Sequence, residues 1–133
     1  MDIVYIKRGY CSFKSSDSLR TQTKDIPDGY GVYVFHKNER DGEILYIGKS
    51  GTILQNGCYE VQCLKDRLNN SQCGMGREKF LRKKMEENKE IQQIFIEWYI
   101  IDEQKYLPAF IEALLLQDYY TENSCLPIWN NKF

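Results

Sequence analysis

The chain has 133 residues, 42% of them hydrophobic, and a formal net charge of −1 at pH 7. This length fits one domain with a sizeable core and leaves little room for a second folding unit. No apolar run is long enough to span a bilayer and no secretory leader is evident, so we expect a cytoplasmic protein without membrane contacts. The balanced charge excludes a global attraction to nucleic acid, and any such contact therefore needs a local basic surface.

The five cysteines form an odd number, which favours reduced thiols over a disulfide framework. Cys58, Cys63 and Cys73 lie close together in sequence. A zinc site would need a fourth ligand, yet the only histidine, His36, falls in a predicted hairpin, and the spacings match no common zinc pattern. Burial as small apolar residues is the favoured interpretation.

We divide the chain into an N-terminal extension, residues 1–29, that packs on the core, and a main domain, residues 30–133. The extension offers a strand over 3–6 and then a polar stretch closed by Pro27-Asp28-Gly29. It is followed by two β-rich runs, 29–36 and 43–47, with a polar connection between them that predicts a hairpin. With the turn centred on that connection, facing residues have numbers that sum to 79.

This register places Tyr33 directly opposite Tyr46, with Cβ atoms roughly 5 Å apart. Two phenols would then share one spot beside the bend Gly48-Lys49-Ser50-Gly51. An ordinary cross-strand aromatic pair explains these two residues equally well.

The remaining sequence alternates helical and strand signals. Helical spacing of apolar residues predicts helices over 59–68 and 77–88, separated by a polar break at 69–76. The dense β-branched and aromatic run at 93–100 predicts a buried strand. Pro108 suits the first turn of a helix that runs to about residue 120. The order hairpin, two helices, strand, helix indicates a small α+β domain.

Glu112 is the most unusual charge, because its helical neighbours three and four positions away are apolar: Pro108, Ala109, Leu115 and Leu116. A buried carboxylate must be paired, protonated or bound to a cation. One alternative is a buried salt bridge, for instance to Arg67. The other is a metal ligand, because magnesium is commonly held by one carboxylate together with water and a substrate phosphate.

Several basic residues are ambiguous on their own. Arg67 lies beside the apolar positions of its helix, where an arginine is more often solvated, and Lys49 sits in a turn. The densest basic cluster is either a solvated face or a track for a phosphate backbone, and comprises Arg77, Lys79, Arg82, Lys83 and Lys84. Asn130 fits a terminal turn.

Taken in order, these motifs resemble the GIY-YIG nuclease domain over roughly residues 30–130. The elements that carry the resemblance are Gly31-Val32-Tyr33, Tyr46-Ile47-Gly48-Lys49-Ser50, Arg67, Glu112 and Leu126-Pro127-Ile128-Trp129-Asn130. The family includes homing endonucleases, some restriction enzymes and the incising subunit of bacterial nucleotide excision repair. The resemblance implies a three-stranded antiparallel sheet flanked by helices, with a shallow active site on the sheet.

The resemblance also implies hydrolysis of DNA phosphodiester bonds with one divalent metal, Mg²⁺ or Mn²⁺. Glu112 would hold this metal. Tyr33, near Lys49 and the metal, would ionise readily and serve as general base, while Tyr46 would position water or phosphate. Arg67 would stabilise the transition state.

The other site residues have supporting roles in this interpretation. Gly31, Gly48 and Asn130 would brace the site. Contacts to nucleic acid would come from a set of basic residues: Lys49, Arg77, Lys79, Arg82 and Lys83. A homodimer stays open, because one site cuts one strand at a time.

Two departures from the family pattern leave alternatives. Many members carry a histidine four residues after the arginine, where this chain has Ser71, and Tyr59 is the only nearby tyrosine that could take that place. The interval before Arg67 is also longer than usual, with an insertion at about 51–62. The chain could therefore be a catalytically impaired module that binds nucleic acid without cutting it, or, less favoured, a protein-interaction domain.

Overall fold

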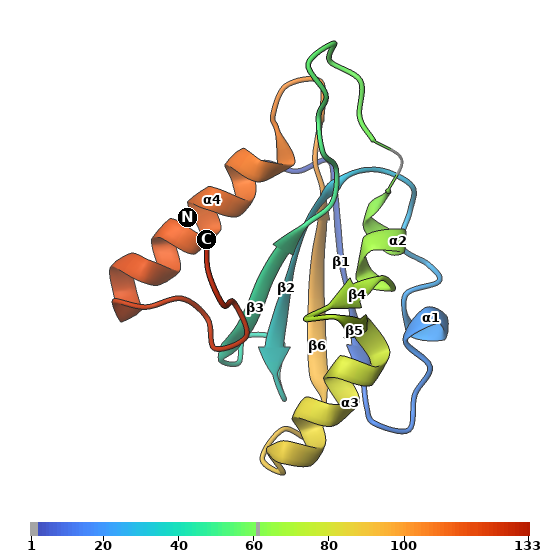
Figure 1. Cartoon of the computed structure of the whole chain (residues 1–133), viewed down its shortest axis with the longest axis vertical. Coiled ribbons are helices and arrows are strands. Elements are labelled where there is room, and N and C mark those ends of the chain that lie inside the picture. Colours follow the sequence, from blue (N-terminus) through green and yellow to red (C-terminus); the bar gives the residue numbers. More distant parts are fainter. Residues whose placement is uncertain (1–2, 61) are drawn as a thin grey trace.

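The computed structural model describes residues 3–60 and 62–133, and it is an α+β fold (Figure 1). An antiparallel sheet has the strand order β1-β6-β2-β3. Its strands are β1 Lys7–Phe13, β2 Gly31–Lys37, β3 Ile44–Lys49 and β6 Ile94–Ile100. The helices are α1 Leu19–Gln22, α2 Leu64–Leu68, α3 Arg77–Glu87 and α4 Pro108–Asn123. A small ribbon pairs β4 Ser71–Gln72 with β5 Met75–Gly76.

The main sheet has four strands, so the expected three-stranded sheet is wrong by one strand. The extra strand is β1, which pairs with β6 along its whole length; it begins at Lys7, not in the expected stretch 3–6. Pairing with β1 satisfies the main-chain groups on the edge of β6 that faces away from β2. Phe13, Leu19 and Ile26 of the N-terminal extension lie in the main hydrophobic core. The extension therefore packs into the same unit as the rest of the chain.

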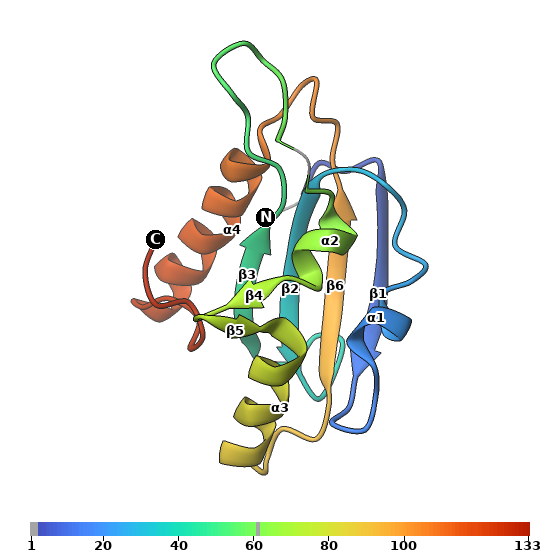
Figure 2. The same cartoon turned by 45° about the vertical axis from the view of Figure 1, so that its right-hand side comes forward.

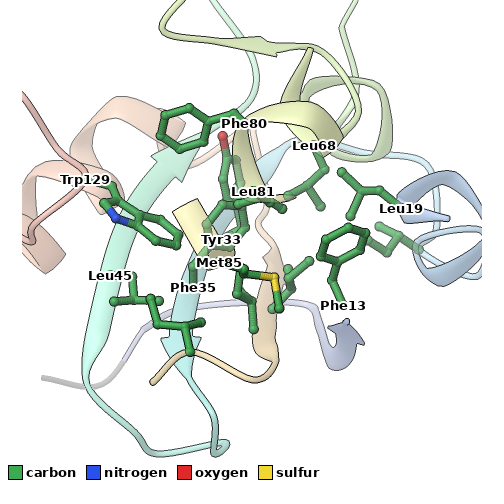
Figure 3. Packing of buried hydrophobic residues seen from close by; sticks show 14 of the residues in the cluster. Phe13, Leu19, Tyr33, Phe35, Leu45, Leu68, Phe80, Leu81, Met85 and Trp129 are labelled. Carbon is green, nitrogen blue, oxygen red and sulfur yellow. The ribbon is translucent and has the colours of Figure 1, made fainter. Parts of the chain in front are cut away.

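Helices cover both faces of the sheet (Figures 1 and 2). On one face, Val34 and Ile47 pack against Leu116 of α4. On the other face, Tyr33 and Phe35 pack into a larger cluster with residues of α1, α2 and α3, drawn in Figure 3. Because neighbours in a strand point to opposite faces, β2 is buried on both sides and reads as a continuous apolar run.

The predicted hairpin between β2 and β3 is present, but its register differs from the expected one. Tyr33 faces Gly48 and Phe35 faces Tyr46, so the expected direct pairing of the two tyrosines is wrong. The register shifts between Phe35 and His36, and this irregularity leaves Leu45 without a facing residue. A shift of two residues keeps both tyrosines on one face, as diagonal neighbours.

The middle of the chain differs from the sequence expectation in two places. The helix expected over 59–68 begins only at Leu64, and Tyr59 instead pairs with Ile53 in a bridge that closes a loop over 53–59. The break expected at 69–76 contains the β4–β5 ribbon, whose turn uses positive φ angles at Cys73 and Gly74. The expected helices at 77–88 and 108–120 and the strand at 93–100 are confirmed. Within the described residues, no helix is long and apolar enough to cross a membrane.

The five cysteines are free thiols. Cys11 and Cys63 are half-buried, and desolvation raises the pKa of Cys11 to about 12. The expected burial of the cysteines is wrong for Cys58, Cys73 and Cys125, which are exposed.

Candidate active site

Tyr33 lies on β2, on the sheet face that α3 covers, and its side chain has no exposed surface. Its ring passes directly over Gly48 of β3, where an added Cβ would lie 2.5 Å from the Tyr33 hydroxyl oxygen. Glycine at position 48 is therefore required by the tyrosine at position 33. Gly31 is also tightly enclosed, since a Cβ there would overlap the main-chain carbonyl of Tyr99 on β6.

Tyr46 is the phenol that reaches the surface. It is half-buried, its ring centroid is 6.1 Å from that of Tyr33, and it lines a polar cleft of about 200 Å³. The cleft is also lined by Arg67, Ser71, Gln72, Cys73, Trp129, Asn130, Asn131 and Lys132. Burial, with the neighbouring Tyr33 and Glu112, raises the pKa of Tyr46 to about 12, against the opposing effect of Arg77 and Arg67.

Arg67 lines this cleft, and Glu112 interacts electrostatically with both Arg67 and Tyr46. Arg67, on α2, donates a hydrogen bond of 3.1 Å to the main-chain carbonyl of Ser71. Glu112, on α4, is half-buried, and burial raises its pKa while Lys49 and Arg67 act in the opposite direction. Among the residues that the structure describes, Glu112 has no ion pair, so the alternative of a salt bridge to Arg67 is not found.

Asn130 fastens the outer edge of β3. Its amide donates to the carbonyl of Ile47 and accepts from the N–H of Ile47, each at 3.0 Å. The preceding Trp129 donates its main-chain N–H to the carbonyl of Leu45 and packs edge-on against Phe80. The segment after α4 therefore covers the strand that carries Tyr46 and Gly48.

The donor set fits a divalent ion only in a limited way. In residues 3–60 and 62–133 no three His, Cys, Asp or Glu side chains gather into a group that could hold a metal. Glu112 supplies one carboxylate, an oxygen ligand of the kind that magnesium prefers, which leaves the remaining positions to water and a substrate phosphate. The site therefore suits an ion bound together with a phosphate and not one held tightly by the protein alone.

Arg77 has a place that the sequence analysis did not foresee. It was assigned to an exposed basic face, yet it is fully buried, which excludes a surface contact with nucleic acid. One of its terminal nitrogens donates a 2.8 Å hydrogen bond to the Tyr33 hydroxyl. The position was readable from the sequence, since Arg77 lies three and four residues before Phe80 and Leu81, on the buried stripe of α3.

The rest of the basic cluster is divided. Arg82 is bound within the protein, to the Glu78 carboxylate and to the main-chain carbonyls of Ser15 and Asp17. Lys79 and Lys83 are exposed. The expected continuous basic face is thus reduced to separate lysines.

Tyr59 does not take the place of the missing histidine. It stacks on Tyr30 with ring centroids 4.7 Å apart, and its hydroxyl donates to the carbonyl of Glu103. Both contacts anchor the insertion to the end of the sheet.

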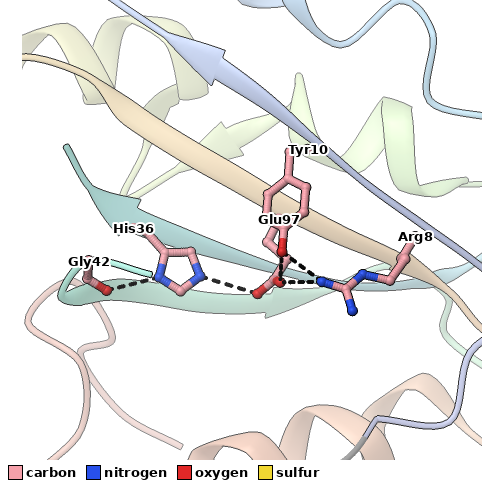
Figure 4. A network of polar contacts seen from close by, with 5 residues as sticks. All are labelled: Arg8, Tyr10, His36, Gly42 and Glu97. Carbon is pink, nitrogen blue, oxygen red and sulfur yellow. Dashed lines mark hydrogen bonds and ion pairs between the residues drawn. The ribbon is translucent and has the colours of Figure 1, made fainter. Parts of the chain in front are cut away.

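A separate polar network lies around β6, on residues that the sequence analysis did not assign to a site (Figure 4). Glu97 accepts a hydrogen bond from the Tyr10 hydroxyl and forms ion pairs with Arg8 and His36. The other ring nitrogen of His36 lies 3.0 Å from the carbonyl oxygen of Gly42. These groups satisfy one another and join three strands of the sheet.

Comparison with models of known families, with curated proteins and with solved structures gives no match for this chain.

Proposed function

We propose that the protein is a metal-dependent endonuclease of the GIY-YIG type that hydrolyses DNA phosphodiester bonds. One observation carries this proposal: Tyr46, Arg67 and Glu112, from β3, α2 and α4, lie within electrostatic range of one another, and the first two line a polar cleft. Lys49 acts on the same carboxylate. Groups so far apart in sequence need not meet for the fold alone, and they are the residues on which the resemblance depends.

The burial of the two phenols changes the roles expected from the resemblance. Tyr33 has no exposed surface, whereas Tyr46 lines the cleft, so Tyr46 is the better candidate for contact with the attacking water. With a pKa of about 12, Tyr46 keeps its proton at neutral pH in the free protein. The positive charge of a divalent ion bound nearby would favour the phenolate.

The proposed reaction follows from these positions. A divalent ion bound at Glu112 would neutralise charge on the scissile phosphate and lower the pKa of adjacent acidic groups. The Tyr46 phenolate, formed by loss of the phenol proton to solvent, accepts a proton from water as the water oxygen bonds to phosphorus and one P–O ester bond breaks. The departing oxygen takes a proton from solvent, and Tyr46 later returns its own. Arg67 stabilises the additional negative charge of the transition state.

Nicking of supercoiled plasmid in Mg²⁺ or Mn²⁺ tests the proposal. We expect cleavage by the native protein and a loss of about a hundredfold or more in Tyr46→Phe, Arg67→Ala and Glu112→Gln, because each removes one reacting or charge-stabilising group. Arg8→Met, on the opposite edge strand of the sheet, should cut normally. Cleavage that survives all three site substitutions would overturn the proposal.

The high pKa of Tyr46 and the burial of Tyr33 also favour a second candidate function, a nucleic-acid-binding module that does not cut. The same assay distinguishes the two functions when DNA binding is measured alongside. Binding that depends on Arg67, with no cleavage in either metal, would support the second function.

A further inference from the structure

Arg77 carries a charge that the fold does not neutralise. The side chain is wholly buried, and among the described residues it pairs with no carboxylate and leaves Nε and one terminal nitrogen without hydrogen-bond partners. Its one side-chain hydrogen bond goes to the Tyr33 hydroxyl. Isolated buried charge is costly, so a fold that keeps it without compensation needs another reason for it.

Aromatic rings surround this guanidinium. Its central carbon lies 5.2 Å from the ring centroid of Tyr33, 5.4 Å from that of Phe35 and 5.5 Å from that of Tyr46. Cation–π contacts at these distances recover part of the desolvation cost. Two of the three rings are the phenols of the candidate site, so the charge is placed where a phenolate would form.

We infer that Arg77 is a positioning residue of the candidate site: it fixes the Tyr33 hydroxyl and stabilises negative charge on the phenol pair while Tyr46 takes a proton from water. The inference rests on the proposed function. In this role the Arg77 guanidinium has a counter-ion only during the reaction. That counter-ion is the phenolate, which forms beside it when the base is ready to act.

The other charged groups near the phenols do not replace Arg77. Arg67 from α2 also favours the phenolate of Tyr46, while Glu112 from α4 opposes it. From β6, the strand residue that faces Tyr33 is Trp98, which carries no charge. Arg77 is thus the only cation in direct hydrogen-bond contact with either phenol among the residues described.

Replacement of Arg77 should change the stability and the activity of the protein in opposite directions. Arg77→Met keeps the apolar stem and removes an incompletely paired buried charge, so we expect an unfolding temperature equal to or above that of the native protein. Cleavage at neutral pH should fall tenfold or more. A purely structural arginine would give the reverse, with lower stability and normal turnover of the protein that remains folded.

The decisive experiment is an alkaline titration of tyrosinate absorbance, which needs no substrate. The Tyr46 transition is identified as the one absent from Tyr46→Phe, and it should move to higher pH in Arg77→Met, because the guanidinium favours the phenolate. The rising limb of the pH–rate profile should move in the same direction. Arg8→Met is the matched control for cleavage, because Arg8 also stands over three tyrosine rings but outside the site.

The outcomes separate the inference from the proposed function. If the native protein cuts no DNA, the proposed function fails, while the titration still tests Arg77. An unmoved Tyr46 transition in Arg77→Met overturns the inference, whatever the cleavage result. Arg77→Gln serves where Arg77→Met does not fold, and failure of both to fold would also overturn it, because Arg77 would then serve the fold.

Discussion

Asn130 and Ile47 exchange two hydrogen bonds, each of 3.0 Å, so the side chain of one residue pairs with both main-chain groups of the other. Ile47 stands between Tyr46 and Gly48 on the outermost strand of the sheet. In effect the amide acts as a short piece of a fifth strand. The pairing fixes the main chain of β3 next to Tyr46, the half-buried phenol.

The first prediction concerns this pairing. Asn130→Ala should lower the free energy of unfolding by about 1–3 kcal/mol, because two partly buried main-chain groups lose their partners. Chemical unfolding in urea measures the change. Asn131→Ala is the control and should change stability by less than about 0.5 kcal/mol, since Asn131 is exposed and bonds only weakly, to the sulfur of Cys73. Equal effects of the two substitutions would contradict the role given to the Ile47 pairing.

The second prediction concerns the contact between Gly48 and Tyr33. Gly48→Ala should destabilise the protein by about 2 kcal/mol or more, because the new methyl group overlaps a ring that is packed on all sides and cannot move away. Thermal unfolding followed by circular dichroism measures it. Gly76→Ala has open space around the added Cβ and an ordinary φ of −56°, and should cost less than about 1 kcal/mol. Normal stability of Gly48→Ala would mean that Tyr33 does not lie over β3.

Local signals were sufficient for most elements of the fold. The aromatic and β-branched run of β6, the proline that begins α4 and the apolar stripe of α3 each specify their structure within a few residues. The position of β1 could not be read in this way, because Lys7–Phe13 becomes a strand by pairing with β6, far along the chain. The β2–β3 register failed for a related reason, since the irregularity at Leu45 has no sequence signature.

For the candidate site, motif order predicted that distant residues lie near one another, but it did not predict how deeply each is buried. Tyr46, Arg67 and Asn130 line one cleft. That Tyr33 is buried follows from how α3 packs on the sheet, which no local pattern contains. The basic residues around Arg77 predict an exposed side chain, which is wrong, whereas its spacing to Phe80 and Leu81 indicates the buried side of α3.

The third prediction concerns the pH dependence of stability through Glu97 and His36. Burial tends to raise the pKa of Glu97, but hydrogen bonds from His36 and two tyrosines outweigh it and lower the value to about 2. Burial tends to lower the pKa of His36, but the contact with Glu97 outweighs this effect, so the pKa of His36 is raised. The stability due to Glu97 is present above its ordinary value of 4.5 and is lost as pH falls toward 2, whereas that due to His36 is present below 6.5 and is lost as pH rises through its higher folded value.

The network should therefore stabilise the folded protein most between about pH 4.5 and pH 6.5. The decrease in the free energy of unfolding below this range, the acid limb, should amount to about 3 kcal/mol at most. Urea midpoints measured across the pH range test this. Glu97→Gln should flatten both limbs, because it removes the titrating carboxylate and the partner of His36. Glu90→Gln is the control, since Glu90 is mostly exposed in its ion pair with Lys37. An acid limb that persists unchanged in Glu97→Gln would assign it to other groups.

The fourth prediction concerns Glu112 and the divalent ion. Because burial raises the pKa of this carboxyl, its favourable contribution is present below 4.5 and is lost as pH rises through the folded value. Without metal at neutral pH, Glu112→Gln, which resembles the protonated acid, should therefore be as stable as the native protein or more stable. Millimolar Mn²⁺ should raise the unfolding temperature of the native protein but not that of Glu112→Gln, because ligand binding to the folded state alone stabilises it.

Glu122→Gln provides the matched control for this last experiment, since it removes an exposed carboxylate from the same helix. It should retain the full response to Mn²⁺. A response that is equal in Glu112→Gln and Glu122→Gln would place the ion elsewhere. If Glu112→Gln were instead clearly less stable than the native protein without metal, the ionised carboxylate would have a structural partner, and the reason for expecting a cation beside it would be lost.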